Sequence, residues 1–94
     1  MITAKQRAFL KSKLNTVKPV LRIGKDGLKD EVFESIDLYL NKNEIMKIQL
    51  LQNTEVDAYE LFDELEARLN VEFVQKLGNV LSIYRQSDKK IYLE

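Results

Sequence analysis

Apolar residues recur along this chain with two spacings, one typical of helices and the other of strands. Apolar positions three or four residues apart share one face of a helix, whereas short apolar or alternating runs indicate strands. By these patterns the helices are expected at residues 4–14, 28–41 and 57–69, and the strands at residues 20–23, 45–51, 71–77 and 80–85.

Local signals support the first helix. Thr3 and Gln6 form the pattern of a capping box, in which each side chain bonds the backbone amide of the other. Phe9, Leu10 and Leu14 give the helix that follows an apolar side. Lys5, Arg7, Lys11 and Lys13 are spread over the remainder of the helix surface.

Alternation in the second strand predicts how the sheet is covered. Met46, Ile48 and Leu50 share one face of this strand, while Lys47 and Gln49 share the other. Such a pattern fits a sheet that is covered on one face only.

The order of elements predicts the fold class. Strands that alternate with helices need crossover connections, so part of the sheet should be parallel. Gly78 and Asn79 join the last two strands as a two-residue hairpin, which makes the sheet mixed. We expect one α/β domain over residues 1–94, in the order α-β-α-β-α-β-β. It should be a two-layer sandwich, with a four-stranded mixed sheet and its helices on one face.

Composition excludes much chemistry. The 94 residues include no Cys and no His, which removes thiolate nucleophiles, disulfides, most metal sites and the usual general base. No catalytic residue, cofactor or metal is expected, and the acids of the third helix are interpreted as a solvated face. The chain lacks an apolar run of membrane-spanning length and a leader peptide, so a soluble, cytoplasmic protein is expected. A monomer that does not bind membranes is expected as well.

The net charge is zero, but the charges are unevenly distributed. Residues 1–29 carry eight basic and one acidic side chain, whereas residues 30–72 carry twelve acidic and three basic ones. This asymmetry favours a basic surface that faces a polyanion, or else a solvated face without function. The tyrosines and phenylalanines lie mostly on apolar stripes and are interpreted as core rather than base-stacking residues, Tyr84 least clearly.

One motif could carry chemistry, namely Gly24-Lys25-Asp26-Gly27 between a strand and a helix. Glycines let a phosphodiester backbone come close, and the amides at a helix start attract phosphate. Lys25 adds a charge at the tip. A plain strand-to-helix turn is the alternative interpretation. Asp26 would repel phosphate if it pointed outward, and it could instead cap the second helix.

Several segments, taken together, are familiar. They are Thr3-Ala4-Lys5-Gln6-Arg7, Lys18-Pro19-Val20, Ile23-Gly24-Lys25-Asp26-Gly27-Leu28, Asn43-Glu44-Ile45-Met46-Lys47-Ile48, Val74-Gln75-Lys76-Leu77-Gly78 and Leu81-Ser82-Ile83-Tyr84-Arg85. In this order and spacing the chain resembles the YhbY family of CRM-domain RNA-binding proteins over essentially its whole length.

The resemblance implies a fold like the C-terminal domain of translation initiation factor three, with an additional N-terminal helix. It also implies binding to ribosomal RNA in precursors of the large ribosomal subunit and a role in ribosome assembly. The RNA-contacting residues that it implies are Gly24, Lys25, Asp26, Gly27, Lys29, Arg22, Lys5, Lys11, Lys18, Lys47 and Arg85.

Two departures from the family pattern keep an alternative open. Members are often basic overall, whereas this chain is neutral with acidic second and third helices, and Asn79 replaces a common Lys. Both weaken the expected affinity for RNA. The alternative function is a protein-interaction adaptor that docks on a ribosomal protein through the acidic helices. An enzyme would need Lys, Asp or Glu in a pocket that so small a domain hardly provides.

Overall fold

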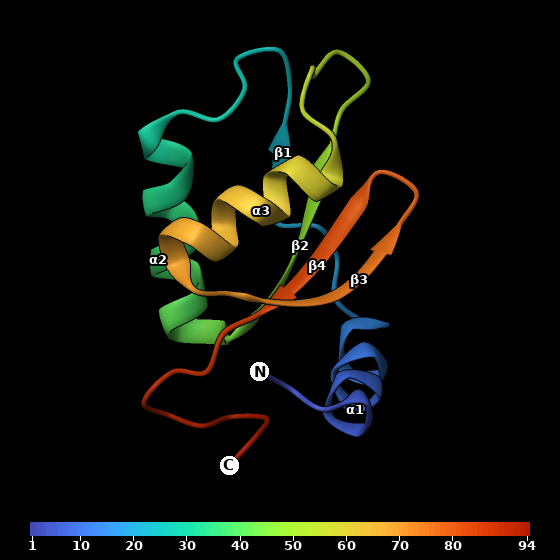
Figure 1. Ribbon diagram of the computed structural model, residues 1–94, viewed down its shortest axis with the longest axis vertical. Coiled ribbons are helices and arrows are strands. Elements are labelled where there is room, and N and C mark those ends of the chain that lie inside the picture. Colours follow the sequence, from blue (N-terminus) through green and yellow to red (C-terminus); the bar gives the residue numbers. More distant parts are fainter.

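A four-stranded sheet lies at the centre of the molecule, with its strands in the order β1-β2-β4-β3 (Figure 1). It is seen in a computed structural model that describes residues 1–94. The helices are α1 (Ala4–Leu14), α2 (Asp30–Asn43) and α3 (Ala58–Leu69), and the strands are β1 (Leu21–Ile23), β2 (Ile45–Leu50), β3 (Glu72–Leu77) and β4 (Val80–Tyr84). The predicted order of elements is confirmed.

The sheet is mixed, as predicted. β1 runs parallel to β2, with Leu21 opposite Ile48, and α2 forms the crossover between them. β4 is antiparallel to both β2 and β3. Gly78, with a φ of +58°, turns the hairpin between β3 and β4. The chain therefore has the expected α/β fold class.

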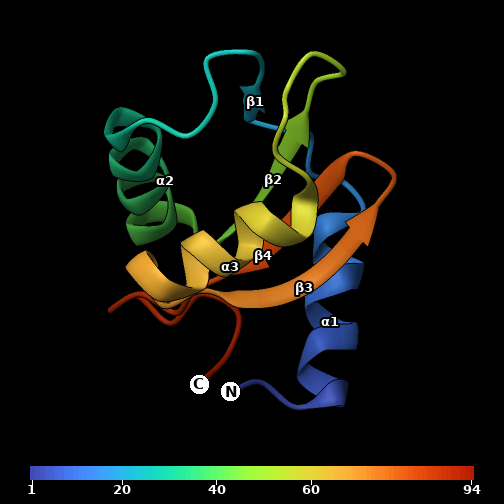
Figure 2. The same ribbon diagram turned by 45° about the horizontal axis from the view of Figure 1, so that its top comes forward.

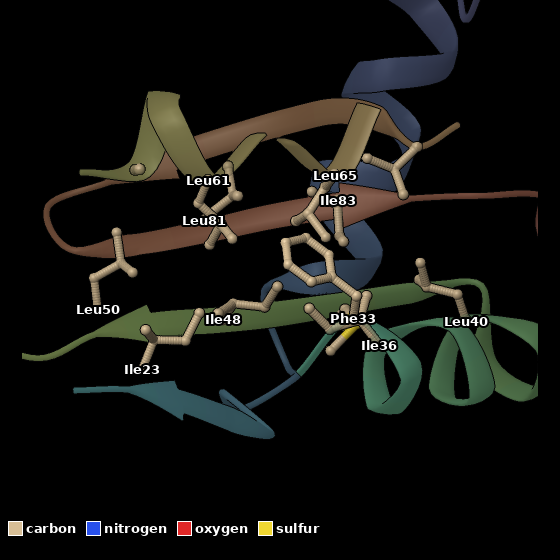
Figure 3. Close-up of a cluster of buried hydrophobic side chains, with 13 residues drawn as sticks. Ile23, Phe33, Ile36, Leu40, Ile48, Leu50, Leu61, Leu65, Leu81 and Ile83 are labelled. Atoms are coloured by element: carbon tan, nitrogen blue, oxygen red, sulfur yellow. The ribbon is translucent and has the colours of Figure 1, made fainter. Parts of the chain in front are cut away.

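The main core lies between the sheet and the two inner helices. Helices α2 and α3 cover one face, and thirteen buried residues form a single cluster there (Figure 3). Phe33 and Ile36 from α2 meet Leu61 and Leu65 from α3 above the strands. In each helix these buried residues are three or four positions apart, so the spacing of apolar residues determines which helix faces turn inward.

Helix α1 lies on the opposite face of the sheet (Figure 2). Leu10 and Leu14 pack there against Ile45, Val74 and Tyr84 in a second buried cluster. Ile45 directly precedes Met46, so its side chain points to the other face of β2. The expectation of a sheet covered on one face only is therefore wrong at this end. The apolar side of α1 is also narrower than predicted, because Phe9 is 42% exposed.

The boundaries of α2 differ from those predicted. The helix begins at Asp30 rather than at residue 28, since Lys29 is still extended with a ψ of 163°. Lys29 occupies the cap position and no side chain bonds the first amides. Asp26 therefore does not cap α2, which corrects that interpretation. At the other end α2 continues to Asn43, and Glu44 leaves the helix with a φ of +68°.

The C-terminal tail is fastened to the domain by Glu44. The carboxylate of Glu44 is fully buried and accepts hydrogen bonds from the Ser87 amide and hydroxyl, both at 2.7 Å, and from the Ile91 amide at 3.0 Å. Tyr92 and Leu93 then pack against the second cluster. The short apolar segment near the C-terminus thus extends the cover of α1.

None of the three helices has the length and apolar character that a membrane crossing requires.

Candidate nucleic-acid interface

The turn at residues 24–27 stands exposed at the end of β1. The Gly27 amide donates to the Gly24 carbonyl at 3.1 Å, which closes the turn. Lys25 and Asp26 occupy its exposed tip. Gly27 has a φ of +71°, a conformation that side chains other than glycine rarely adopt. The local sequence therefore dictates a tight, open turn rather than a buried one.

A second loop, residues 51–57, lies beside this turn at the same end of the molecule (Figures 1 and 2). A Cβ atom at Gly24 would come within 3.3 Å of the Asn53 Oδ1 atom and 3.5 Å of a Leu51 methyl group. At Gly27, by contrast, a Cβ would meet open space. Gly24 thus allows two loops to approach each other, while Gly27 provides the backbone conformation.

The turn borders an open hollow of about 480 Å³ between β1 and the start of α2. Three cations line it, Arg22, Lys25 and Lys29, together with the carboxylates of Asp26 and Glu31. The side chain of Arg22 is held by its Nε donor, which bonds Gln49 Oε1 at 3.1 Å. The hollow keeps a positive excess in spite of its two acids.

The start of α2 contributes backbone donors to the same place. No side chain caps this helix. The Val32 amide donates to the Lys29 carbonyl at 3.0 Å, which leaves the Asp30 and Glu31 amides for another acceptor. Asp30 carries a negative charge there, but its carboxylate pairs with Arg68 at 3.0 Å, toward α3 and outside the lining of the hollow. Amides, helix dipole and cations together suit a phosphate group.

Two further predicted residues lie along the sheet. Lys47 shares its face of β2 with Gln49, the partner of Arg22. Lys18 precedes β1, where the Val20 amide donates to the Lys47 carbonyl. Lys18 and Lys47 therefore lie near the start of β1, whereas the turn follows the end of that strand.

The structure does not bring Lys5 and Lys11 to the turn. Both lie on α1, which packs at the opposite end of the sheet from the two loops (Figure 1). Lys11 lines a different hollow, beside β3. The predicted basic surface is therefore divided, and only Arg22, Lys25 and Lys29 gather at the turn.

Arg85 has a structural role. Its Nη1 atom pairs with Asp37 at 2.8 Å and donates to the Leu69 carbonyl at 3.1 Å, and Nη2 bonds Asn41 at 2.9 Å. These contacts tie β4 to the C-terminal ends of α2 and α3. The Arg85 amide bonds the carbonyl of Glu44, at the start of β2, whereas the turn lies at the end of β2. The expected contact of Arg85 with RNA has no support in this geometry.

Acidic side chains of α2 and α3 line the groove between these two helices. Between these helices the Arg68 guanidinium stacks 3.8 Å from the centre of the Phe33 ring. Glu60, Asp63 and Glu64 line one side of this groove. Nowhere in the chain do three carboxylates converge closely enough to hold a metal ion.

Sequence reasoning missed Asn53, which completes the hollow at the turn. A signal was present, because loops that follow neighbouring parallel strands meet at one edge of a sheet. Residues 51–57 follow β2, just as the turn follows β1.

Comparison with known proteins gives one consistent result. A family model described as the CRS1 / YhbY (CRM) domain matches residues 2–85. The chain is 32% identical over 94 residues to the "Probable RNA-binding protein YqeI" of Bacillus subtilis, covering all of this chain and 98% of that one. It is also 32% identical over 88 residues to the "Probable RNA-binding protein PA4753" of Pseudomonas aeruginosa, covering 94% and 85%.

A solved structure agrees in fold. The solution structure of the hypothetical protein SAV1595 from Staphylococcus aureus matches with a TM-score of 0.81 and 34% identity. The match covers all of this chain and 98% of that one. Fold and sequence therefore lead to the same family.

Proposed function

Because the chain belongs to the CRS1 / YhbY (CRM) domain family, a non-catalytic family, we propose that it binds RNA through the turn at residues 24–27. The observation that carries this proposal is the gathering of Arg22, Lys25 and Lys29 around one open hollow beside an uncapped helix. Relatives that match the chain nearly end to end bear the name of RNA-binding proteins, which supports the same class of ligand.

The contacts at the turn suit phosphate rather than bases. Glycines, backbone amides and lysines hold a sugar–phosphate backbone without reading its sequence. Binding should therefore be strongly salt-dependent and weakly base-specific. We further propose ribosomal RNA in precursors of the large subunit as the target, with assistance to ribosome assembly as the outcome, as the family resemblance implies.

The central experiment compares two double variants in filter binding of ribosomal RNA fragments. Lys25→Ala with Lys29→Ala should weaken binding at least tenfold, because two cations leave one hollow. The matched control is Lys42→Ala with Lys89→Ala, which removes two exposed lysines outside that hollow. Equal affinity of both double variants, at unchanged melting temperature, would refute the assignment of the turn. No binding by the wild-type protein at low salt would refute RNA binding itself.

The acidic helices favour a second function, docking on a basic ribosomal protein. The groove between α2 and α3 is lined by Glu60, Asp63 and Glu64, so it is suited to a cationic side chain of a partner. Asp63→Lys with Glu66→Lys would then abolish association with ribosomal particles, while the turn variants would not. The reverse result favours direct RNA binding.

A further inference from the structure

We propose that the chain has a second RNA-contacting surface at the edge strand β3, where a nucleotide base stacks on Tyr59 beside the cations Arg7, Lys11 and Lys76. We call these four residues the β3-edge surface. The inference rests on the proposed RNA binding and adds a site for bases to the phosphate site at the turn.

Three elements distant in sequence form this surface. β3 is the last strand of the sheet, and α1 and α3 reach it from opposite faces. An open hollow of about 420 Å³ lies beside the strand, lined by the four residues together with Phe73, Val74, Gln75 and Leu77. The basic first helix thus contributes its charge here rather than at the turn.

The cations of the surface are available to a ligand. Arg7 donates from Nε to the Phe73 carbonyl at 2.9 Å, which holds its guanidinium at the strand. None of the three side chains takes part in the ion pairs of the chain. Asp57 attracts Lys76 electrostatically, but its carboxylate caps α3, where it accepts a hydrogen bond from the Glu60 backbone amide at 2.8 Å. Arg7 and Lys11 remain without such a counter-charge among the residues that line the hollow.

Tyr59 supplies the stacking platform. It lies in the first turn of α3 and is 59% exposed, so its ring contributes little to the core. The Lys76 Nζ atom lies 5.5 Å from the centre of the ring. Leu77, 64% exposed on the same strand, extends the apolar area. An exposed aromatic ring with cations around it is the arrangement that holds single-stranded nucleic acid by stacking.

The two surfaces are joined by a continuous segment. The 51–57 loop contributes Asn53 to the hollow at the turn and leads directly into α3, where Tyr59 is the second residue. The outer strands of a four-stranded sheet lie about 14 Å apart, since neighbouring strands are about 4.8 Å apart. One RNA strand that passes this loop would meet both surfaces.

The test measures binding of a fluorescently labelled, unstructured 20-nucleotide RNA by anisotropy. Tyr59→Ala should weaken binding about tenfold or more, in line with the loss of one stacked base. Tyr59→Phe keeps the ring and should retain the wild-type affinity. The matched control is Leu38→Ala, which removes another exposed apolar side chain, 68% exposed, on α2. Lys76→Glu serves as a second variant that leaves Tyr59 in place, and it should also weaken binding.

The absence of Trp permits a direct readout. Stacking should quench tyrosine fluorescence when RNA is added, and Tyr59→Phe should abolish most of that quenching. Wild-type affinity in both Tyr59→Ala and Lys76→Glu, while Lys25→Ala with Lys29→Ala binds weakly, would overturn the second surface and leave the proposed function intact. Failure of the wild-type protein to bind the RNA would overturn both. If Tyr59→Ala and Lys76→Glu bind RNA like the wild-type protein but no longer bind a protein partner, the surface is a protein-docking surface and the proposal is wrong.

Discussion

The two glycines of the turn at residues 24–27 are required for different structural reasons. Gly27 adopts a φ of +71° with open space around it, so a side chain there would be strained rather than crowded. Gly24 has an ordinary φ, but a side chain there would press on Asn53. The two positions should therefore respond differently to the same substitution.

Gly27→Ala should lower the free energy of unfolding by about 1 kcal/mol, because alanine tolerates the left-handed region poorly. Gly27→Asn should cost less, since asparagine visits this region more readily. Urea unfolding of both variants checks the expectation. Equal losses would mean that the turn relaxes to another conformation and that its φ is not a requirement.

Glu44 makes the tail dependent on pH. Burial alone would raise the pKa of Glu44, but hydrogen bonds from Ser87, Tyr92 and Ile91 outweigh it and hold the pKa below its ordinary value. The folded state therefore binds the proton more weakly than the unfolded state does. The stabilisation is fully present above the ordinary pKa, near 4.5, and is lost as pH falls through the lower pKa of the folded state.

Glu44→Gln should be destabilised relative to the wild-type protein at pH 7, by about 1–3 kcal/mol, because charge-assisted hydrogen bonds are lost. The difference between the two proteins should shrink as the pH falls below 4.5. Urea unfolding across this range measures it. A difference that stays constant with pH would show that Glu44 stabilises the tail by shape rather than by charge.

At the scale of single residues, the sequence predicts a role only where the interacting residues are close together along the chain. The capping box of Thr3 and Gln6 is present as expected, with the Gln6 amide bonded to the Thr3 hydroxyl at 3.0 Å. Glu44 could not be predicted, because its hydrogen-bond donors lie more than forty residues away. The same holds for Tyr84, whose pKa rises to about 12 through burial and the charge of Glu44.

At the scale of elements, α1 shows what periodicity leaves open. Its apolar residues predict a helix with one buried side, yet they do not say which sheet face that side covers. Leu10 and Leu14 are fully buried on the face that alternation in β2 marks as open. The extra helix therefore turns a sheet with one covered face into a sheet covered on both faces at one end.

Leu14→Ala should lower the free energy of unfolding by about 2–5 kcal/mol, because it leaves a cavity in the second cluster. Phe9→Ala, in the same helix, should cost clearly less, since the Phe9 side chain is 42% exposed. Urea unfolding of the pair tests how α1 is oriented. Similar losses for both variants would contradict the observed packing of α1.

For Arg85, the family resemblance implies a contact with RNA, whereas the structure shows contacts within the domain. Arg85→Ala should lower the free energy of unfolding by about 1–3 kcal/mol, because the Asp37 carboxylate and the Leu69 carbonyl lose a donor. Affinity for RNA, measured at a temperature where the variant is fully folded, should match that of the wild-type protein. A stable variant that binds RNA weakly would restore Arg85 to the interface.

At the scale of the whole molecule, the fold converts a division along the sequence into a division in space. The acidic middle third forms α2 and α3 and covers one face of the sheet, whereas the basic first third forms α1, β1 and the turn. The sequence alone predicts that basic and acidic residues are separated along the chain, but not where the fold places them on the surface. Because the turn follows β1 at one edge of the sheet, and Arg7 and Lys11 of α1 lie beside β3 at the other edge, the cations form two groups. No count of charges along the chain could distinguish these two groups from one.

This division determines the salt dependence of binding. For single strands, the slope of log affinity against log salt is about −0.7 per phosphate neutralised. Three cations at the turn alone give a slope of about −2, and three more at the β3-edge surface give about −4. Lys25→Ala with Lys29→Ala should therefore reduce the slope by about 1.4, and Lys11→Ala with Lys76→Ala should reduce it by a similar amount. Filter binding between 50 and 300 mM salt measures both variants, and a wild-type slope near −2 that only the first variant reduces would confine RNA to the turn.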